Sequence, residues 1–124
     1  MSVPSDFVFW YKAKVVNVVD GDTLDLDTDL GFRITFRQRY RLYGIDTPEV
    51  NDPDPAVRAL AVKAKEFVQT QVGGKEVVLN SHLDRADKYG RWLAVIHVKD
   101  AAGAWIDLNA ELLRLGLARE APWR

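Results

Sequence analysis

The sequence contains no cysteine, and this absence excludes disulfide scaffolds, thiolate zinc sites and cysteine nucleophiles together. Oxygen and nitrogen atoms are then the expected ligands for any metal ion. Long apolar runs are absent as well, because no run approaches the roughly 18 residues that a membrane-spanning helix requires. The remaining composition, with 48% hydrophobic and 28% charged residues, is ordinary for a globular domain and excludes a disordered chain.

The chain also has little net charge. Its 17 Lys and Arg residues nearly balance its 18 Asp and Glu residues, which leaves a formal charge of -1. A protein that binds nucleic acid through bulk positive charge is strongly basic, so this balance excludes a polybasic binder. The charges nevertheless occur in blocks, with four arginines and no acid at 33–42. The composition is therefore compatible with a site in which a few arginines bind a phosphate group.

The 124 residues fit one domain over 1–124, since single cores commonly run to about 100 to 150 residues. The first residues carry no Lys or Arg ahead of a short apolar run at 7–11. That run is shorter than the core of a signal peptide. We therefore expect a chain that is not exported in this form, and a cytoplasmic, phage or mobile-element protein is favoured.

Alternating patterns predict five strands. A run rich in valine and aromatic residues at 8–19 ends at Asp-Gly-Asp, which is typical of a strand that stops at a turn. Residues 23–42 alternate with a period of two and have a glycine between the halves, which predicts two half-buried strands. Residues 76–83 and 91–98 predict two more strands.

The hairpin expected at 23–42 can close in two registers. A two-residue loop would pair Asp27 with Ile34 and so mix the polar and apolar faces. A loop of odd length instead sets the odd-numbered aspartates opposite the odd-numbered arginines, and opposite charges stabilise such cross-strand pairs. We therefore expect the odd-length loop.

Two helices are also predicted. Apolar residues recur at helical spacing over 56–72, and two glycines at 73–74 supply a stop. Asp107 can cap a second helix that turns Leu108, Leu112 and Leu115 toward the core and ends at Gly116. The order of three strands, a helix, two strands and a helix is that of an OB-fold barrel. We expect a mainly β, α+β protein, with a five-stranded OB-fold barrel and two or three helices.

Two short polar segments, at 20–23 and 46–49, can be interpreted either as turns and helix starts or as parts of a functional site. The segment at 20–23 is by itself a turn signal. Thr47-Pro48 is compatible with a helix start, but the two prolines at 51–55 cannot easily continue a helix. A rigid turn that presents Asp46 and Glu49 is therefore the better interpretation.

Together, in this order and at these separations, the segments resemble the staphylococcal nuclease (thermonuclease) family. The motifs are Asp-Gly-Asp-Thr at 20–23, Arg-x-x-x-Ile-Asp-Thr-Pro-Glu at 41–49, Asp-Lys-Tyr-Gly-Arg at 87–91 and a helix ending in Gly-Leu-Ala at 116–118. The resemblance covers roughly residues 15–118. It implies an OB barrel that acts as a calcium-dependent endonuclease on DNA and RNA, with little sequence specificity and 3'-phosphate products.

The resemblance implies a metal site. Asp22 and Asp46 match the metal-binding carboxylates, Thr47 matches the residue that gives its backbone carbonyl to the ion, and Asp20 matches a further acid nearby. Ligands that are all oxygen favour Ca²⁺, Mg²⁺ or Mn²⁺ over zinc or copper. Two carboxylates with a carbonyl and waters suit the flexible coordination of calcium best, so we expect Ca²⁺, with Mg²⁺ or Mn²⁺ as alternatives.

The resemblance also implies the catalytic residues. Glu49 matches the general base toward the attacking water, and Arg41 and Arg91 match two arginines that hold the scissile phosphate. A guanidinium offers two parallel donors that match phosphate oxygens, which lysine does not. Lys88 and Tyr89 match residues that contact the terminal phosphate of a bound nucleotide.

Converging acids carry an electrostatic cost. If Asp22, Asp46 and Glu49 come together, each pair about 4 Å apart would repel by about 4 kcal/mol at an effective dielectric of 20. Such a cluster is expected to need a cation.

Two features depart from the family pattern. The segment between Thr23 and Arg41 is a few residues longer than the usual hairpin, so we expect an extended hairpin. Relatives carry tyrosines after Gly-Leu-Ala that stack on the bound base, where this sequence has Pro122 and Trp123. Either Trp123 replaces the tyrosines as a stacking surface, or this end packs against a second copy of the chain in a homo-oligomer.

Alternatives to an enzyme stay open. A catalytically inactive OB-fold module could bind nucleic acid or another protein, although the presence of every expected acid and arginine favours the enzyme. The other arginines of 33–41 either contact nucleic acid or pair with the aspartates opposite them. We expect structural roles for His82 and His97, and core positions for Trp10, Trp92 and Trp105.

Overall fold

A computed structural model of the chain describes residues 9–83 and 92–121. The five predicted strands and both predicted helices are present, together with three short strands that the patterns did not predict, β4, β7 and β8. In chain order the elements are β1 (Trp10–Asp20), β2 (Thr23–Asp29), β3 (Thr35–Leu42), β4 (Ile45–Asp46), α1 (Pro55–Val72), β5 (Glu76–Leu83), β6 (Trp92–Lys99), β7 (Trp105–Asp107), α2 (Leu108–Arg114) and β8 (Arg119–Glu120).

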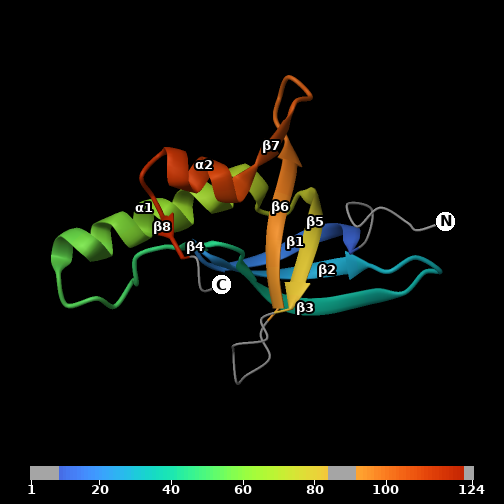
Figure 1. The fold of residues 1–124 in the computed structure, drawn as a ribbon, viewed down its shortest axis with the longest axis horizontal. Helices are drawn as coiled ribbons and strands as arrows, with labels where there is room; N and C mark the ends of the chain where they lie inside the picture. The colour runs from blue at the N-terminus through green and yellow to red at the C-terminus, as the bar shows by residue number, and fades with distance from the viewer. Residues whose placement is uncertain (1–8, 84–91, 122–124) are drawn as a thin grey trace.

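The five long strands close into a barrel. Strand β2 lies between β1 and β3, and β1 continues through β5 to β6, with every one of these neighbours antiparallel. Strands β3 and β6 then pair in parallel, from Tyr40 with Trp92 to Leu42 with Ala94, and this pairing closes the ring. The predicted five-stranded OB-fold barrel is confirmed (Figure 1).

The β2–β3 hairpin has the predicted register. Asp25 lies opposite Arg39 and Asp27 opposite Arg37, and the loop between the last paired residues spans 30–34, an odd number of residues. Nε of Arg37 lies 2.7 Å from Oδ1 of Asp27, and the corresponding Arg39–Asp25 distance is 2.8 Å. Hydrogen bonds from these guanidinium groups lower the pKa of both carboxyl groups.

The hairpin extends beyond the end of the barrel. Figure 1 shows the β2–β3 loop projecting away from the other strands. Only the Tyr40 and Leu42 end of the apolar face of β3 is buried, whereas Ile34 and Phe36 are exposed, contrary to the prediction of a half-buried strand throughout. The alternation identifies the side of the strand correctly, but past the barrel that side is exposed.

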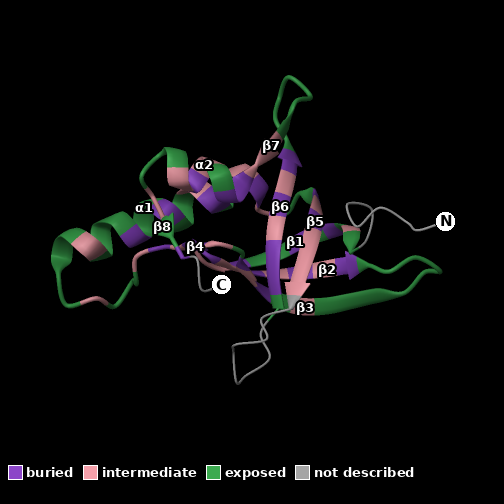
Figure 2. Cartoon of the chain, viewed as in Figure 1, coloured by how far each residue is buried: buried purple, intermediate pink, exposed green. Residues whose placement is uncertain are grey.

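Each helix buries one apolar face against the barrel. Asp54 caps α1 by accepting a hydrogen bond from the Ala56 amide, and Gly73 ends the helix as predicted. Asp107 caps α2 in the same way, also as predicted. Figure 2 shows the buried stripe of α1, formed by Ala61, Ala64, Val68 and Val72.

Some predicted core positions are wrong. Leu115 is exposed because α2 ends at Arg114, before the helix turns that side chain inward. Trp10, Trp92 and Trp105 are exposed as well, since they lie at the first residues of their strands, at the rim of the sheet. Within the described ranges, no helix is long and apolar enough to cross a membrane.

Candidate functional site

The turn between β1 and β2 places Asp22 in a buried position. Its side chain is 7% exposed. Thr23 Oγ1 donates to its Oδ1 over 3.0 Å, and the backbone amide of Thr47 donates to its Oδ2 over 3.2 Å. The Leu42 amide also donates to the Asp22 carbonyl oxygen. These bonds fix the carboxylate between the end of β3 and the segment after β4.

Gly21 explains why this turn can approach the helix so closely. A Cβ atom at this position would lie 2.9 Å from Cβ of Ala64 and 3.2 Å from the side chain of Thr47. Neither neighbour is the far end of a flexible side chain, so a larger residue would push the turn away from α1. The missing side chain therefore allows Asp22 to reach Thr47.

A short ladder holds the second acidic segment. Asp46 in β4 pairs with Arg119 in β8, and Ile45 pairs with Glu120. Residues 47–49 are not helical, and the amide of Asp52 donates to the carbonyl of Glu49 over 3.3 Å. The predicted turn after Asp46 is therefore confirmed. Thr47 is buried and Glu49 is exposed.

Arg41 brings the two acidic segments together. It lies at the end of β3, and its side chain is 17% exposed. Its Nη2 atom lies 3.4 Å from Oδ2 of Asp22 and 3.7 Å from Oδ1 of Asp46. Two carboxylates predicted to share a site are thus gathered around one guanidinium group.

The guanidinium of Arg41 also has an unused donor. Its Nε atom is buried and has no hydrogen-bond partner, which is true of no other side-chain nitrogen or oxygen among the residues that the structure describes. Leaving a buried donor unsatisfied costs about 1 to 3 kcal/mol, more for a charged group. A phosphate oxygen is a strong acceptor for such a donor. The Arg41 side chain is 17% exposed, so a small shift of it would bring Nε within reach of an oxyanion.

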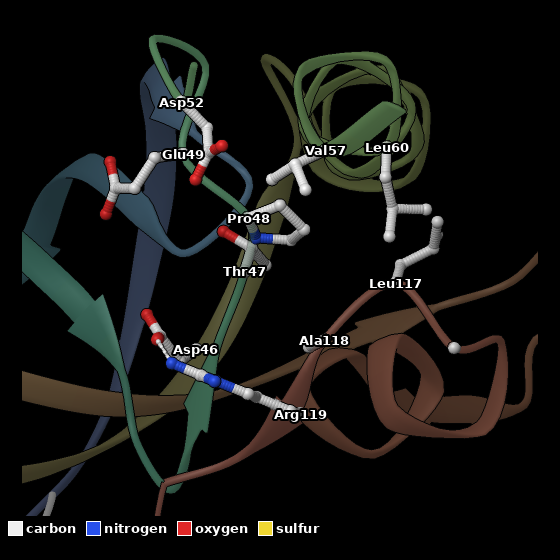
Figure 3. Close-up of a pocket in the computed structure, with 11 residues that line it drawn as sticks. Asp46, Thr47, Pro48, Glu49, Asp52, Val57, Leu60, Leu117, Ala118 and Arg119 are labelled. Carbon is white, nitrogen blue, oxygen red and sulfur yellow. Dashed lines mark hydrogen bonds and ion pairs between the residues drawn. The ribbon is translucent and has the colours of Figure 1, made fainter. Parts of the chain in front are cut away.

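A cavity of about 420 Å³ opens beside Asp46. Figure 3 shows Asp46, Thr47, Glu49 and Asp52 on one side, with Val57 and Leu60 of α1 facing Leu117 on the other. Its volume lies within the range of small-molecule sites. The acidic wall suits a cation, and the apolar wall suits an apolar group of a ligand.

Arg119 is a site residue that the motifs did not identify. Its Nη2 lies 3.3 Å from Oδ2 of Asp46, and its side chain, 76% exposed, borders the cavity. The Gly-Leu-Ala motif ends one residue earlier, and only the β4–β8 ladder brings this arginine opposite Asp46. The one feature of the sequence that could have indicated this role is the basic residue directly after the motif.

Asn109 is a second residue whose role the sequence did not reveal. Its side-chain amide donates to the carbonyls of Tyr43 and Ala94, at 2.9 and 3.1 Å, and its oxygen accepts from the Ile96 amide at 3.2 Å. This buried side chain therefore connects α2 to β6 and to Tyr43, just after the end of β3. Arg41 is the second-last residue of β3, so Asn109 supports the segment next to Arg41.

The three expected acids do not form one cluster. Within 9–83 and 92–121, no three His, Asp or Glu side chains lie close enough together to hold a metal ion. The cation that separates Asp22 from Asp46 here is Arg41, while Glu49 lies at the cavity rim. The expectation of three converging carboxylates is therefore corrected to two carboxylates and a guanidinium. Asp20 is partly exposed at the end of β1.

A metal ion would find oxygen ligands in this arrangement. Both carboxylates approach the same point, Nη2 of Arg41, to within 3.7 Å, and the buried Thr47 adjoins them through its amide. Carboxylate and carbonyl oxygens are the ligands of hard divalent cations such as Ca²⁺. The two carboxylates thus fit a hard cation, and the Thr47 carbonyl stays an expected ligand.

Several expected site residues lie outside the described part of the chain. These are Lys88, Tyr89, Arg91 and Trp123. The described strand β6 begins at Trp92, which pairs with Tyr40, the neighbour of Arg41. The roles expected of the undescribed residues, including the stacking or self-association of the C-terminal segment, stay predictions.

Comparison with known proteins agrees with the motifs. A family model described as "Staphylococcal nuclease homologue" matches residues 39–123. The thermonuclease of Staphylococcus hyicus is 32% identical over 114 residues, which cover 90% of this chain and 60% of that protein. An uncharacterized protein of Methanocaldococcus jannaschii is 32% identical over 127 residues, covering 88% and 58%. Endonuclease YncB of Bacillus subtilis is 34% identical over 116 residues, covering 89% and 50%. The chain thus spans between 50% and 60% of the length of these relatives.

Proposed function

The chain belongs to the staphylococcal nuclease homologue family, and from this membership and the geometry of the site we propose that it is a nuclease. It hydrolyses phosphodiester bonds of DNA or RNA with little sequence specificity and leaves 3'-phosphate ends. Its cofactor is Ca²⁺, in preference to Mg²⁺ or Mn²⁺. The observation that carries the proposal is the convergence of Asp22 and Asp46 on the guanidinium of Arg41.

The metal site of this proposal consists of Asp22, Asp46 and the backbone carbonyl of Thr47. A bound calcium ion supplies positive charge to the non-bridging oxygens of the phosphate. The chain contributes the fixed positions of the ligands, because Asp22 is anchored by the Thr47 amide and Asp46 lies in the β4–β8 ladder. Pre-positioned ligands bind the ion without first having to be ordered.

Arg41 binds the phosphate in this mechanism. Its Nε has no partner among the described residues but is buried, so a shift of the side chain, which is 17% exposed, would let it donate to a non-bridging oxygen. Negative charge grows on these oxygens as water attacks, and a fixed guanidinium stabilises that charge in the transition state. Arg91 supplies the second guanidinium, as the resemblance implies.

Glu49 removes the proton of the attacking water. It is exposed and lines the cavity beside Asp46 and Thr47, so water can reach its carboxylate. Loss of a general base lowers a rate by about 10² to 10⁴. Glu49→Gln should therefore lower kcat by that factor and leave substrate binding largely unchanged.

The test of the proposal is cleavage of a single-stranded DNA oligonucleotide with Ca²⁺, with Mg²⁺, with Mn²⁺ and with a chelator. We expect fragments with 3'-phosphate ends in Ca²⁺ and none with the chelator. Arg91→Ala should abolish cleavage, whereas Arg37→Ala, an exposed arginine paired with Asp27, should not. Binding without cleavage under every condition would instead identify an inactive binding module. Neither binding nor cleavage would favour a protein-interaction role.

A further inference from the structure

A second hollow lies on the outer surface of the sheet, away from the acidic site. Trp10 of β1, Val78 of β5, His97 of β6 and Trp105 of β7 border a hollow of about 220 Å³, which we call the aromatic groove. Trp10 begins β1, and Asp20, next to the acidic turn, ends the same strand. The groove therefore lies toward the opposite end of that strand.

Two tryptophans make flat, accessible surfaces in this groove. Trp10 is 42% exposed and Trp105 is 56% exposed. The ring centroids of Trp10 and His97 lie 5.2 Å apart with a tilt of 36°. Such contacts hold the ring of Trp10 in place and leave part of it open to solvent. Exposing two tryptophans costs hydrophobic free energy that burial would recover, so a role in binding is a reasonable interpretation.

The positive charge beside the groove is close to the rings. Nζ of Lys99 lies 5.2 Å from the centroid of Trp105. A neighbouring hollow of about 290 Å³ shares Val78 and Trp105 with the groove and is lined by Lys12, Lys99 and one acid, Glu76. Lysine cations thus outnumber carboxylates along the combined surface.

Two other acids, on the adjacent loop and strand, accept hydrogen bonds from backbone amides. Asp107 accepts a hydrogen bond from the Ala110 amide at the start of α2. Asp100 accepts from the amides of Ala102 and Ala104, each at 2.9 Å. Both carboxylates keep their charge, but neither lines the two hollows, where the described charged side chains are Lys12, Lys99 and Glu76.

We propose that the aromatic groove binds single-stranded nucleic acid, with bases stacked on Trp10 and Trp105 and phosphates beside Lys12 and Lys99. Because the ligand is taken to be nucleic acid, this inference rests on the proposed function and adds a second contact for the same substrate. Aromatic rings accept every base, since every base has a flat face, and lysines bind the backbone without reading sequence. The groove thus suits an enzyme with little sequence preference.

A second copy of the chain fits this surface less well. In a symmetric dimer the same patch meets itself, so Lys12 and Lys99 of both copies would come close together. Like charges facing one another disfavour such an interface. A polyanion instead neutralises all of these lysines.

The test is the affinity for fluorescein-labelled oligothymidylate of 20 nucleotides, measured by anisotropy with a chelator so that no cleavage occurs. Stacking contributes about 1 to 3 kcal/mol per base by alanine substitution. The double variant W10A/W105A should therefore bind about tenfold more weakly or worse. W10F/W105F keeps two flat rings and should retain most of the affinity. Phe32→Ala removes an aromatic ring that is 96% exposed at the hairpin tip and serves as the matched control.

A second measurement tests the lysines. For single strands the logarithm of the binding constant falls with the logarithm of salt concentration, with a slope of about -0.7 per neutralised phosphate. Lys12→Gln and Lys99→Gln should each make that slope shallower by about this amount. Circular dichroism and the melting temperature of every variant check that the fold is retained.

The outcomes separate this inference from the proposed function. Parental affinity in W10A/W105A would overturn the groove assignment, whether or not the enzyme cleaves. Light scattering that shows a dimer in the parent and a monomer in W10A/W105A, with unchanged oligothymidylate affinity, would also overturn it and identify an interface between copies. Weaker binding by W10A/W105A would support the groove even if the parent cleaved no DNA, and in that case only the proposed reaction would fail.

Discussion

Nη2 of Arg41 lies 3.4 Å from Oδ2 of Asp22, a buried carboxylate that the Thr47 amide also holds. The same nitrogen lies 3.7 Å from Asp46. One guanidinium therefore contacts both acids, and Arg119 contacts Asp46 as well, at 3.3 Å. A metal ion entering between these acids would balance their charge, which would release the guanidinium for a phosphate.

The first prediction concerns the shape of the Arg41 side chain. Arg41→Lys keeps the charge but loses the planar fork, so a single ammonium group must serve two carboxylates and the phosphate. Loss of one fixed donor to a developing oxyanion costs about 10² to 10³ in rate. We expect kcat/KM on single-stranded DNA with Ca²⁺ to fall by that factor.

The matched control is Arg37→Lys on the same strand, whose guanidinium is exposed and paired with Asp27. This control should cleave at nearly the parental rate. Equal rates for Arg41→Lys and the parent would refute the assignment of Arg41 to the phosphate.

The second prediction concerns Arg119, which competes for Asp46. Its side chain is largely exposed, and exposed ion pairs contribute about 0.2 to 1 kcal/mol. Arg119→Ala should therefore strengthen Ca²⁺ binding by up to about fivefold, because 1.4 kcal/mol corresponds to a factor of ten. Isothermal titration with CaCl₂ measures the effect.

Arg114→Ala is the control for charge alone, since Arg114 pairs with Glu111 rather than with Asp46. It should leave Ca²⁺ affinity close to that of the parent. Weaker Ca²⁺ binding by Arg119→Ala would show that Arg119 supports the metal site instead of competing with it.

The third prediction concerns the buried Asn109. Asn109→Leu has a similar size but leaves the Tyr43 carbonyl and the Ile96 amide without their side-chain partner, whereas the Ala94 carbonyl still accepts from the Tyr43 amide. Each unsatisfied buried group costs about 1 to 3 kcal/mol, and some will rearrange, so the free energy of unfolding should fall by roughly 2 to 4 kcal/mol. Urea denaturation gives the value. Asn17→Ala, which loses one exposed hydrogen bond to Asp25, should change it much less.

The fourth prediction concerns pH and His82. Burial lowers the pKa of His82 below its ordinary value of 6.5, and its ring stacks on Tyr43 with centroids 4.3 Å apart. The unfolded chain therefore binds the proton more tightly than the folded chain does. Above about pH 6.5 the residue is neutral in both states, and stability is lost as the pH falls from there toward the lowered pKa.

His82→Gln should flatten this part of the stability curve, measured by urea denaturation between pH 7.5 and 5. An unchanged slope in His82→Gln would assign the pH dependence to other groups.

The hairpin register, the start of α2 and the end of α1 were predictable because local chemistry determines them. Opposite charges fix the pairing of Asp25 with Arg39, and Asp107 and Gly73 mark helix ends through their own backbone preferences. Short-range rules of this kind need no knowledge of the rest of the chain.

Other features depend on contacts between distant segments. Strands β4 and β8 have two residues each, too few for any period, so the position of Arg119 beside Asp46 could not be predicted. The exposure of Phe36 and Trp105 depends on where the barrel ends, which alternation does not reveal. The motifs predicted Asp22, Arg41 and Asp46 as site residues, but they did not predict that Arg41 lies between the two acids.

The parallel pairing of β3 with β6 has a consequence for the order of folding. It joins Tyr40 to Trp92, far apart in the chain, whereas β2 and β3 are linked by a short loop. Contacts between distant residues form late, because the chain must first lose the entropy of a long loop. Arg41 lies in both pairings, so the hairpin can hold it early while the surroundings of its side chain are completed only at ring closure. Catalytic competence should therefore be among the last properties that a refolding chain regains.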